Sequence, residues 1–116
     1  MAEKIRCVSP VDGSVYAERT VAKKKEIEAA FTAAHAAQDK WKRLPLAERA
    51  KYCSAIVDAM LAMKDAIVPE LAWQMGRPIR YGAGELRGFE ERARYMIAIA
   101  ERSLSDIKPE PKEGFL

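Results

Sequence analysis

The sequence contains few of the residues from which metal sites and disulfide scaffolds are built. It has a single histidine, His35, which excludes a metal site with two histidine ligands, and we predict no metal-binding residue. The only two cysteines, Cys7 and Cys53, could form one disulfide but not a framework of several. Because no signal peptide precedes them, we expect reduced thiols and a cytoplasmic protein.

Long apolar stretches and a strongly basic surface are also missing. No part of the chain approaches the roughly 18 consecutive apolar residues of a membrane-spanning helix, so we expect no membrane partner. The net charge is +3, and only Lys23–Lys25 resembles a basic run. Nucleic-acid-binding proteins usually carry a denser basic face, so we expect no nucleic-acid partner either.

Large aliphatic residues are scarce, and alanine takes their place. The 116 residues suffice for one domain at most, and 49% of them are hydrophobic, but 20 are alanine and only 24 are Leu, Ile, Val or Phe. Alanine has the highest helix propensity and a small side chain. The composition therefore predicts a mainly α-helical chain with a thin core between closely packed helices.

The first part of the chain has the pattern of a β-hairpin. Residues 4–8 and 15–21 alternate between polar and apolar side chains, as strands do. Between them, Pro10 fixes a backbone dihedral angle, and Asp12-Gly13 can supply the positive φ of a tight turn. We therefore predict a hairpin over residues 4–21, which must lie on a larger structure because an isolated hairpin is barely stable in water.

Apolar side chains at spacings of three and four residues predict four helices after the hairpin. The helices are expected at about residues 24–43, 45–63, 66–75 and 84–105. Pro69 should lie in or near the first turn of the third helix, where its missing N–H is tolerated. Gly76 can take the left-handed conformation that ends this helix, and Pro78 follows it. A loop over residues 79–84 and an extended tail over residues 107–116 complete the prediction.

A glycine-rich segment, Gly82-Ala83-Gly84-Glu85-Leu86-Arg87-Gly88, superficially resembles the loop that binds the pyrophosphate of dinucleotides. Its third glycine comes one position too late, and no strand precedes the segment. A glycine loop of this kind binds phosphate only between a strand and a helix. We therefore predict that the segment is the loop that leads into the fourth helix, and that the chain has no cofactor-binding residue.

No other group of side chains predicts catalysis. His35 lies among alanines in a predicted helix, and Cys53 lies on the apolar stripe of the second helix, where a cysteine usually packs as a small hydrophobic side chain. Five arginines in the second half of the chain are Arg77, Arg80, Arg87, Arg92 and Arg94. They could form an anion-binding surface, but such residues more often solvate a helix, and the glutamates between them would cancel much of the field. We predict no catalytic residue in this chain.

Five sequence motifs occur along the chain in the order Ser9-Pro10-Val11-Asp12-Gly13, Ala29–Trp41, Leu44–Ala50, Gly76-Arg77-Pro78 and Glu85–Tyr95. In this order they resemble the amino-terminal segment of the aldehyde dehydrogenase superfamily. Members of that superfamily have an Asn-Pro-x-Thr-Gly turn between two strands, an alanine-rich helix that ends in tryptophan, and a Pro-x-x-Glu-Arg motif. A helix closed by Gly-Lys-Pro and an acidic-led helix with an Arg-Tyr pair follow.

The resemblance implies that residues 1–116 are the amino-terminal portion of a cofactor-binding domain, and hence an incomplete piece of an α/β aldehyde dehydrogenase-like subunit. A complete enzyme of this family uses NAD or NADP to oxidise an aldehyde to a carboxylic acid. A thiolate attacks the aldehyde, hydride passes to the nicotinamide, and water hydrolyses the thioester. The resemblance places the residues for these steps after Leu116, so we expect neither catalysis nor a bound cofactor in this segment alone.

The same resemblance points to two residues near the substrate. In the family, the helix that corresponds to residues 85–105 borders the substrate entrance tunnel, which makes Gly88 and Arg92 candidates for lining it. An arginine there would favour an acidic aldehyde, whereas a solvated charge on an exposed helix face is the alternative. We also expect a homo-oligomer, or self-association through exposed apolar faces.

A different class of function stays open at this point, namely a freestanding helical module that binds other proteins. The two hypotheses make different demands on the surface. A fragment should leave apolar area exposed where the rest of its fold would cover it, whereas an evolved module should have closed its core. A third and weaker alternative is nucleic-acid binding through Lys23–Lys25 and the arginines, with a steep dependence on salt.

Overall fold

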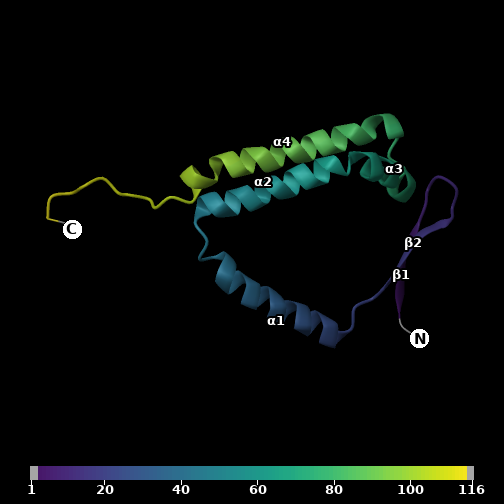
Figure 1. Cartoon of the computed structure of the whole chain (residues 1–116), viewed down its shortest axis with the longest axis horizontal. Helices are drawn as coiled ribbons and strands as arrows, with labels where there is room; N and C mark the ends of the chain where they lie inside the picture. The colour runs from purple at the N-terminus through teal and green to yellow at the C-terminus, as the bar shows by residue number, and fades with distance from the viewer. Residues whose placement is uncertain (1–2, 115–116) are drawn as a thin grey trace.

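The computed structural model describes residues 3–114. Two strands and then four helices follow one another: β1 (Lys4–Val8), β2 (Val15–Thr20), α1 (Lys24–Trp41), α2 (Leu46–Ala62), α3 (Lys64–Met75) and α4 (Ile79–Ser103). The mainly α-helical fold with an amino-terminal β-hairpin is therefore confirmed. Figure 1 shows α2 and α4 side by side, α3 and the hairpin near one end of them, and α1 at an angle to them.

The hairpin forms around the predicted turn. β1 and β2 pair antiparallel, with a bulge between Cys7 and Val8. Gly13 has a φ of 76°, the left-handed conformation that glycine adopts without strain. An oxygen of the Asp12 carboxylate accepts hydrogen bonds from the backbone N–H of Ser14 at 3.0 Å and from its hydroxyl at 2.7 Å. The turn residues therefore hold the connection through local interactions.

The hairpin is fixed to the end of α3 by a buried hydrogen bond and a ring stack. The hydroxyl of Ser9, which is 1% exposed, donates to the backbone carbonyl of Trp73 at 2.6 Å. The ring of Tyr16 stacks on that of Trp73, with centroids 6.3 Å apart. Pro10 lies against Gly76, whose φ of 71° ends α3 as predicted. The larger structure on which the hairpin lies is therefore the carboxyl end of α3.

The first three helices begin close to where the sequence places them. The carboxylate of Glu26 accepts a hydrogen bond from the backbone N–H of Lys23 at 2.7 Å, and α1 begins there without a capping Ser, Thr, Asp or Asn. Pro45 directly precedes α2. The break between α2 and α3 falls at Met63, earlier than expected, so Pro69 lies in the second turn of α3 rather than in or near the first.

The start of α4 is a larger departure from the prediction. Residues 79–84, which we expected to form a loop, are the first turns of this helix. Pro78 precedes the helix with a φ of −55°, and its carbonyl accepts a hydrogen bond from the N–H of Tyr81 at 2.8 Å. The proline therefore starts the helix directly, and the glycines that suggested a loop have a different role, described below.

The structure is open rather than closed around a core. Its radius of gyration is 21.2 Å, whereas a compact domain of this length has about 13 Å. Its accessible surface is 10227 Å², against about 6,300 Å² for a compact protein of its mass. Among the apolar side chains that the structure describes, only Val57 and Leu86 are fully buried, at 3% and 5% exposure. Large apolar side chains stay exposed on both strands and all four helices, including Phe31 at 65% and Ile56 at 61%.

Candidate functional site

Gly82 lies where α4 passes α3. A Cβ atom at this position would lie 2.7 Å from Cγ1 of Val68, closer than such atoms approach in real proteins. Gly82 is also buried, so its missing side chain is what lets the two helices touch. The glycine-rich segment is therefore helical and its first glycine serves helix packing. The prediction that this segment is a loop leading into the fourth helix is wrong.

Gly88 and Arg92 lie one turn apart on α4 and are in contact. The Nε of Arg92 donates a hydrogen bond to the backbone carbonyl of Gly88 at 3.1 Å. A Cβ at Gly88 would lie 3.0 Å from Nη2 of Arg92, so the glycine leaves room for the guanidinium. Arg92 is exposed and forms no ion pair with a carboxylate of residues 3–114. Its charge is available to an anion from outside this part of the chain.

Arg92 also lines a shallow groove of about 330 Å³, together with Glu91, Tyr95 and Met96. Tyr95 and Met96 are exposed. The groove thus combines an aromatic ring and a thioether with one positive and one negative charge. Arg92 was predicted from sequence, whereas Tyr95 and Met96 were not predicted as groove residues. Their spacing of three and four residues from Arg92 on one helix is the signal that could have found them.

Among the other arginines, Arg77 and Arg80 share one aromatic neighbour, because both guanidinium groups lie over the ring of Tyr81, 5.5 and 4.8 Å from its centroid. Arg77 pairs with Glu85 at 2.6 Å. Arg94 pairs with Asp58 at 2.6 Å and with Glu90 at 2.8 Å, the second being a pair at a spacing of four residues on α4. The hydrogen bonds to Asp58 and then Glu90 raise the pKa of the Arg94 guanidinium. The charges of Arg77 and Arg94 are therefore paired with carboxylates on α4 and α2.

Neither the thiols nor the imidazole lie in a catalytic arrangement. The Sγ of Cys7 lies 3.6 Å from the backbone carbonyl of Gln74, and both cysteines are free. Cys53 is exposed, contrary to the expectation of a packed side chain, although it lines a pocket together with Met96 and Ile97 of α4. His35 is exposed on α1. Within residues 3–114, no group of three or more His, Cys, Asp or Glu side chains could hold a metal ion.

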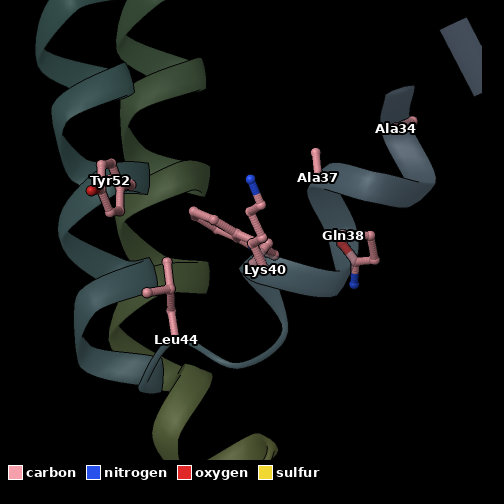
Figure 2. Close-up of a pocket in the computed structure, with 7 residues that line it drawn as sticks. Ala34, Ala37, Gln38, Lys40, Leu44 and Tyr52 are labelled. Atoms are coloured by element: carbon pink, nitrogen blue, oxygen red, sulfur yellow. The ribbon is translucent and has the colours of Figure 1, made fainter. Parts of the chain in front are cut away.

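A larger groove, of about 610 Å³, opens where α1 leaves α2 (Figure 2). Most of its wall is apolar, and its lining includes Ala34, Ala37, Lys40, Trp41, Leu44 and Tyr52. The rings of Trp41 and Tyr52 meet there with centroids 5.7 Å apart and an angle of 58° between their planes. The groove offers a contact surface rather than groups for catalysis. In the part of the chain that the structure describes, no helix has the length and apolar character to cross a membrane.

Comparisons with known proteins agree with one another. The model of the aldehyde dehydrogenase family matches residues 1–115. Aldehyde dehydrogenase B of Escherichia coli (strain K12) is 32% identical over 73 residues, which are 63% of this chain and 14% of that protein. Mitochondrial succinate-semialdehyde dehydrogenase of Arabidopsis thaliana is 26% identical over 105 residues, which are 90% of this chain and 20% of that protein.

A solved structure has the same fold. The NAD-dependent benzaldehyde dehydrogenase from Corynebacterium glutamicum matches 97% of this chain with a TM-score of 0.81 at 24% sequence identity, and the match covers 24% of that chain. This chain therefore spans about a seventh to a quarter of the length of the proteins it matches. In the solved neighbour, the fold that this chain shares is about a quarter of a longer chain.

Proposed function

The chain belongs to the aldehyde dehydrogenase family, and from this membership we propose that it is the amino-terminal part of a subunit that oxidises an aldehyde to a carboxylic acid with NAD or NADP. In this proposal, residues 1–116 cover the outside of the cofactor-binding domain. The nucleophile, the general base and the cofactor site belong to the rest of the subunit. The complete enzyme is a cytoplasmic homo-oligomer, and the segment alone has no catalytic activity.

One observation carries the proposal. The family match extends over residues 1–115, while the chain exposes about 3,900 Å² more surface than a compact protein of its mass. Large apolar side chains are exposed on every strand and helix. An independent interaction module would have buried these side chains in a core of its own, so the alternative of a freestanding module is not favoured.

The proposal can be tested by supplying the rest of a subunit. The corresponding segment of the Corynebacterium benzaldehyde dehydrogenase is replaced by this chain, and benzaldehyde oxidation is followed by the absorbance of NADH. We expect the chimera to oxidise benzaldehyde faster than the same enzyme with the segment deleted. A matched chimera with Leu86→Asp, which puts a charge at a buried apolar position of α4, should lose this gain.

Two outcomes would contradict the proposal. One is a folded chimera that is no more active than the deletion variant. The other is measurable binding of NAD to the 116-residue chain alone in isothermal titration calorimetry, because the proposal assigns the cofactor site to the rest of the subunit.

For the same enzyme we propose that Gly88 and Arg92 border the route of the substrate and that Arg92 binds the carboxylate of an acidic aldehyde. The support is the exposed guanidinium, anchored on the Gly88 carbonyl at 3.1 Å, in a groove that Tyr95 and Met96 also line. In the chimera, Arg92→Gln should raise KM for succinate semialdehyde about ten- to a hundredfold, since hydrogen bonds to charged groups contribute about 1.5–3 kcal/mol. KM for benzaldehyde should stay unchanged.

The control for this prediction is Arg102→Gln, which removes an arginine from the last turn of α4. It should leave the KM for succinate semialdehyde and the KM for benzaldehyde unchanged. Equal rises in KM for the acidic and the neutral aldehyde after Arg92→Gln would show that Arg92 supports the helix and does not select the substrate.

A further inference from the structure

α1 lies apart from α2, α3 and α4, and it meets them at its last turn, where Trp41 contacts Tyr52 (Figure 1). Over the rest of its length, α1 presents an apolar stripe with Ile27 and Phe31 at its amino-terminal half. Both side chains are exposed, and so is Ile56 on α2. Two apolar helix faces in one chain therefore have no partner among residues 3–114.

The groove between these helices lies where α1 leaves α2 and is open to solvent. Figure 2 shows Tyr52 on the α2 side and Ala37 on the α1 side, with Leu44 near the connection. Its volume of about 610 Å³ is lined mainly by apolar side chains. An apolar helix stripe fits this surface better than a polar ligand does, because the lining offers few hydrogen-bonding groups.

The connection over residues 42–45 holds α1 away from α2. The N–H groups of Arg43 and Leu44 donate to carbonyls in the last turn of α1, at 3.2 and 3.1 Å. Pro45 has a φ of −52°, and a proline restricts the residue before it to an extended conformation. Closing α1 onto α2 within one chain would break these turn hydrogen bonds, whereas an incoming helix can fill the groove without moving the connection.

We propose that two copies of this chain pair by exchanging α1, so that each copy places Ile27 and Phe31 in the α1–α2 groove of the other. The contact is reciprocal and gives a two-fold dimer. A stable interface buries about 1,200–2,000 Å² in total, and each copy exposes about 3,900 Å² more than a compact chain, so the available area is sufficient. The inference concerns the 116-residue chain by itself and does not rest on the proposed function.

Size-exclusion chromatography with light scattering measures the mass of the 116-residue chain over about two decades of concentration. We expect the mass to rise to twice the 13.0 kDa of one chain. Phe31→Glu introduces a charge into both halves of the contact and should raise the dissociation constant at least about a hundredfold. Ala36→Glu, on the opposite side of α1, is the matched control and should change the constant less than about threefold.

Far-UV circular dichroism checks that each variant keeps its helices. Ile27→Gln is a milder change in the same apolar stripe. If Phe31→Glu loses helix content, Ile27→Gln is compared with Ala36→Glu in its place. Equal effects of Phe31→Glu and Ala36→Glu would overturn the proposal. A monomer at every concentration would also overturn it, whether small-angle scattering gives a radius of gyration near 21.2 Å, with α1 open, or a smaller one, with α1 closed on its own α2.

Discussion

At the scale of single residues, two glycines of α4 have different roles that a substitution can separate. Gly82→Ala should lower the free energy of unfolding by about 1–3 kcal/mol, because the new Cβ would overlap Val68. Gly84→Ala should raise it by about 0.5–1 kcal/mol, because its Cβ would meet only the end of Arg87 at 3.8 Å and alanine favours the helix. Urea unfolding followed by circular dichroism measures both. Equal effects would contradict the helix-packing role of Gly82.

A second residue-scale prediction concerns the hydroxyl that fixes the hairpin. Ser9→Ala should lower the free energy of unfolding by about 0.5–1.5 kcal/mol, because it removes the hydrogen bond from the buried Ser9 hydroxyl to the Trp73 carbonyl. Ser105→Ala removes a hydroxyl that donates to the Arg102 carbonyl at 2.8 Å on the exposed surface, and it should cost less than about 0.5 kcal/mol. Fluorescence during unfolding in a Trp41→Phe background, where Trp73 is the remaining tryptophan, reports on the contact. A Ser9→Ala variant as stable as Ser105→Ala would show that the hairpin is held by other contacts.

At the scale of elements, the hairpin depends on the charge of Glu18. This carboxylate on β2 accepts hydrogen bonds from Lys4 and Arg6 on β1, which lower the pKa of Glu18. A lowered pKa in the folded state means that the ionised group stabilises the hairpin above the ordinary glutamate pKa, and that this contribution is lost as the pH falls through the lowered value. The protection factors of the β1 and β2 amides, which compare each exchange rate measured by NMR with the intrinsic rate at the same pH, should therefore fall below about pH 4.

Glu18→Gln should remove this pH dependence, because the amide has no charge to lose. Glu101→Gln on α4 removes a glutamate far from the hairpin in sequence and should leave the exchange profile of the strands unchanged. If the strands lose protection at the same pH in the parent chain and in Glu18→Gln, the pH dependence comes from another group.

The elements also differ in how far local sequence predicts them. The turn at Gly13 and the end of α3 at Gly76 were predictable, because both glycines take the positive φ that marks such positions. The start of α4 was not, because Gly82 looks like a loop residue until the contact with Val68 on another helix explains it. The tail prediction was right that residues 107–114 carry no helix or strand, while its last two residues lie outside the described chain.

At the scale of the whole molecule, unfolding exposes less new surface than it does for a compact domain. An unfolded chain of this mass exposes about 19,000 Å², and the folded chain already exposes 10227 Å². The surface newly exposed on unfolding is therefore about 0.7 times that of a compact protein of the same mass. The urea m-value is proportional to the surface exposed on unfolding. We therefore expect an m-value about 0.7 times that of compact domains of 116 residues, measured at concentrations where light scattering reports monomers. A full-size m-value would indicate a closed molecule in solution.

The candidate site, like the elements, was predictable from sequence in part. Gly88 and Arg92 came from a resemblance between motifs, and the structure adds that they contact each other and that Tyr95 and Met96 share their groove. Cys53 was expected to be packed and is exposed, because burial depends on how closely the neighbouring helices approach α2. The periodicity of a helix indicates which side is apolar and carries no information about whether anything covers it.

The order and type of the elements, the turn at Gly13 and the end of α3 were predictable from sequence, because each depends on the conformational preferences of residues that are neighbours along the chain. The start of α4, the docking of the hairpin on Trp73 and the uncovered apolar stripe of α1 became visible in the folded molecule alone. These features depend on contacts between residues far apart in sequence, and such contacts leave no local spacing from which they could be predicted.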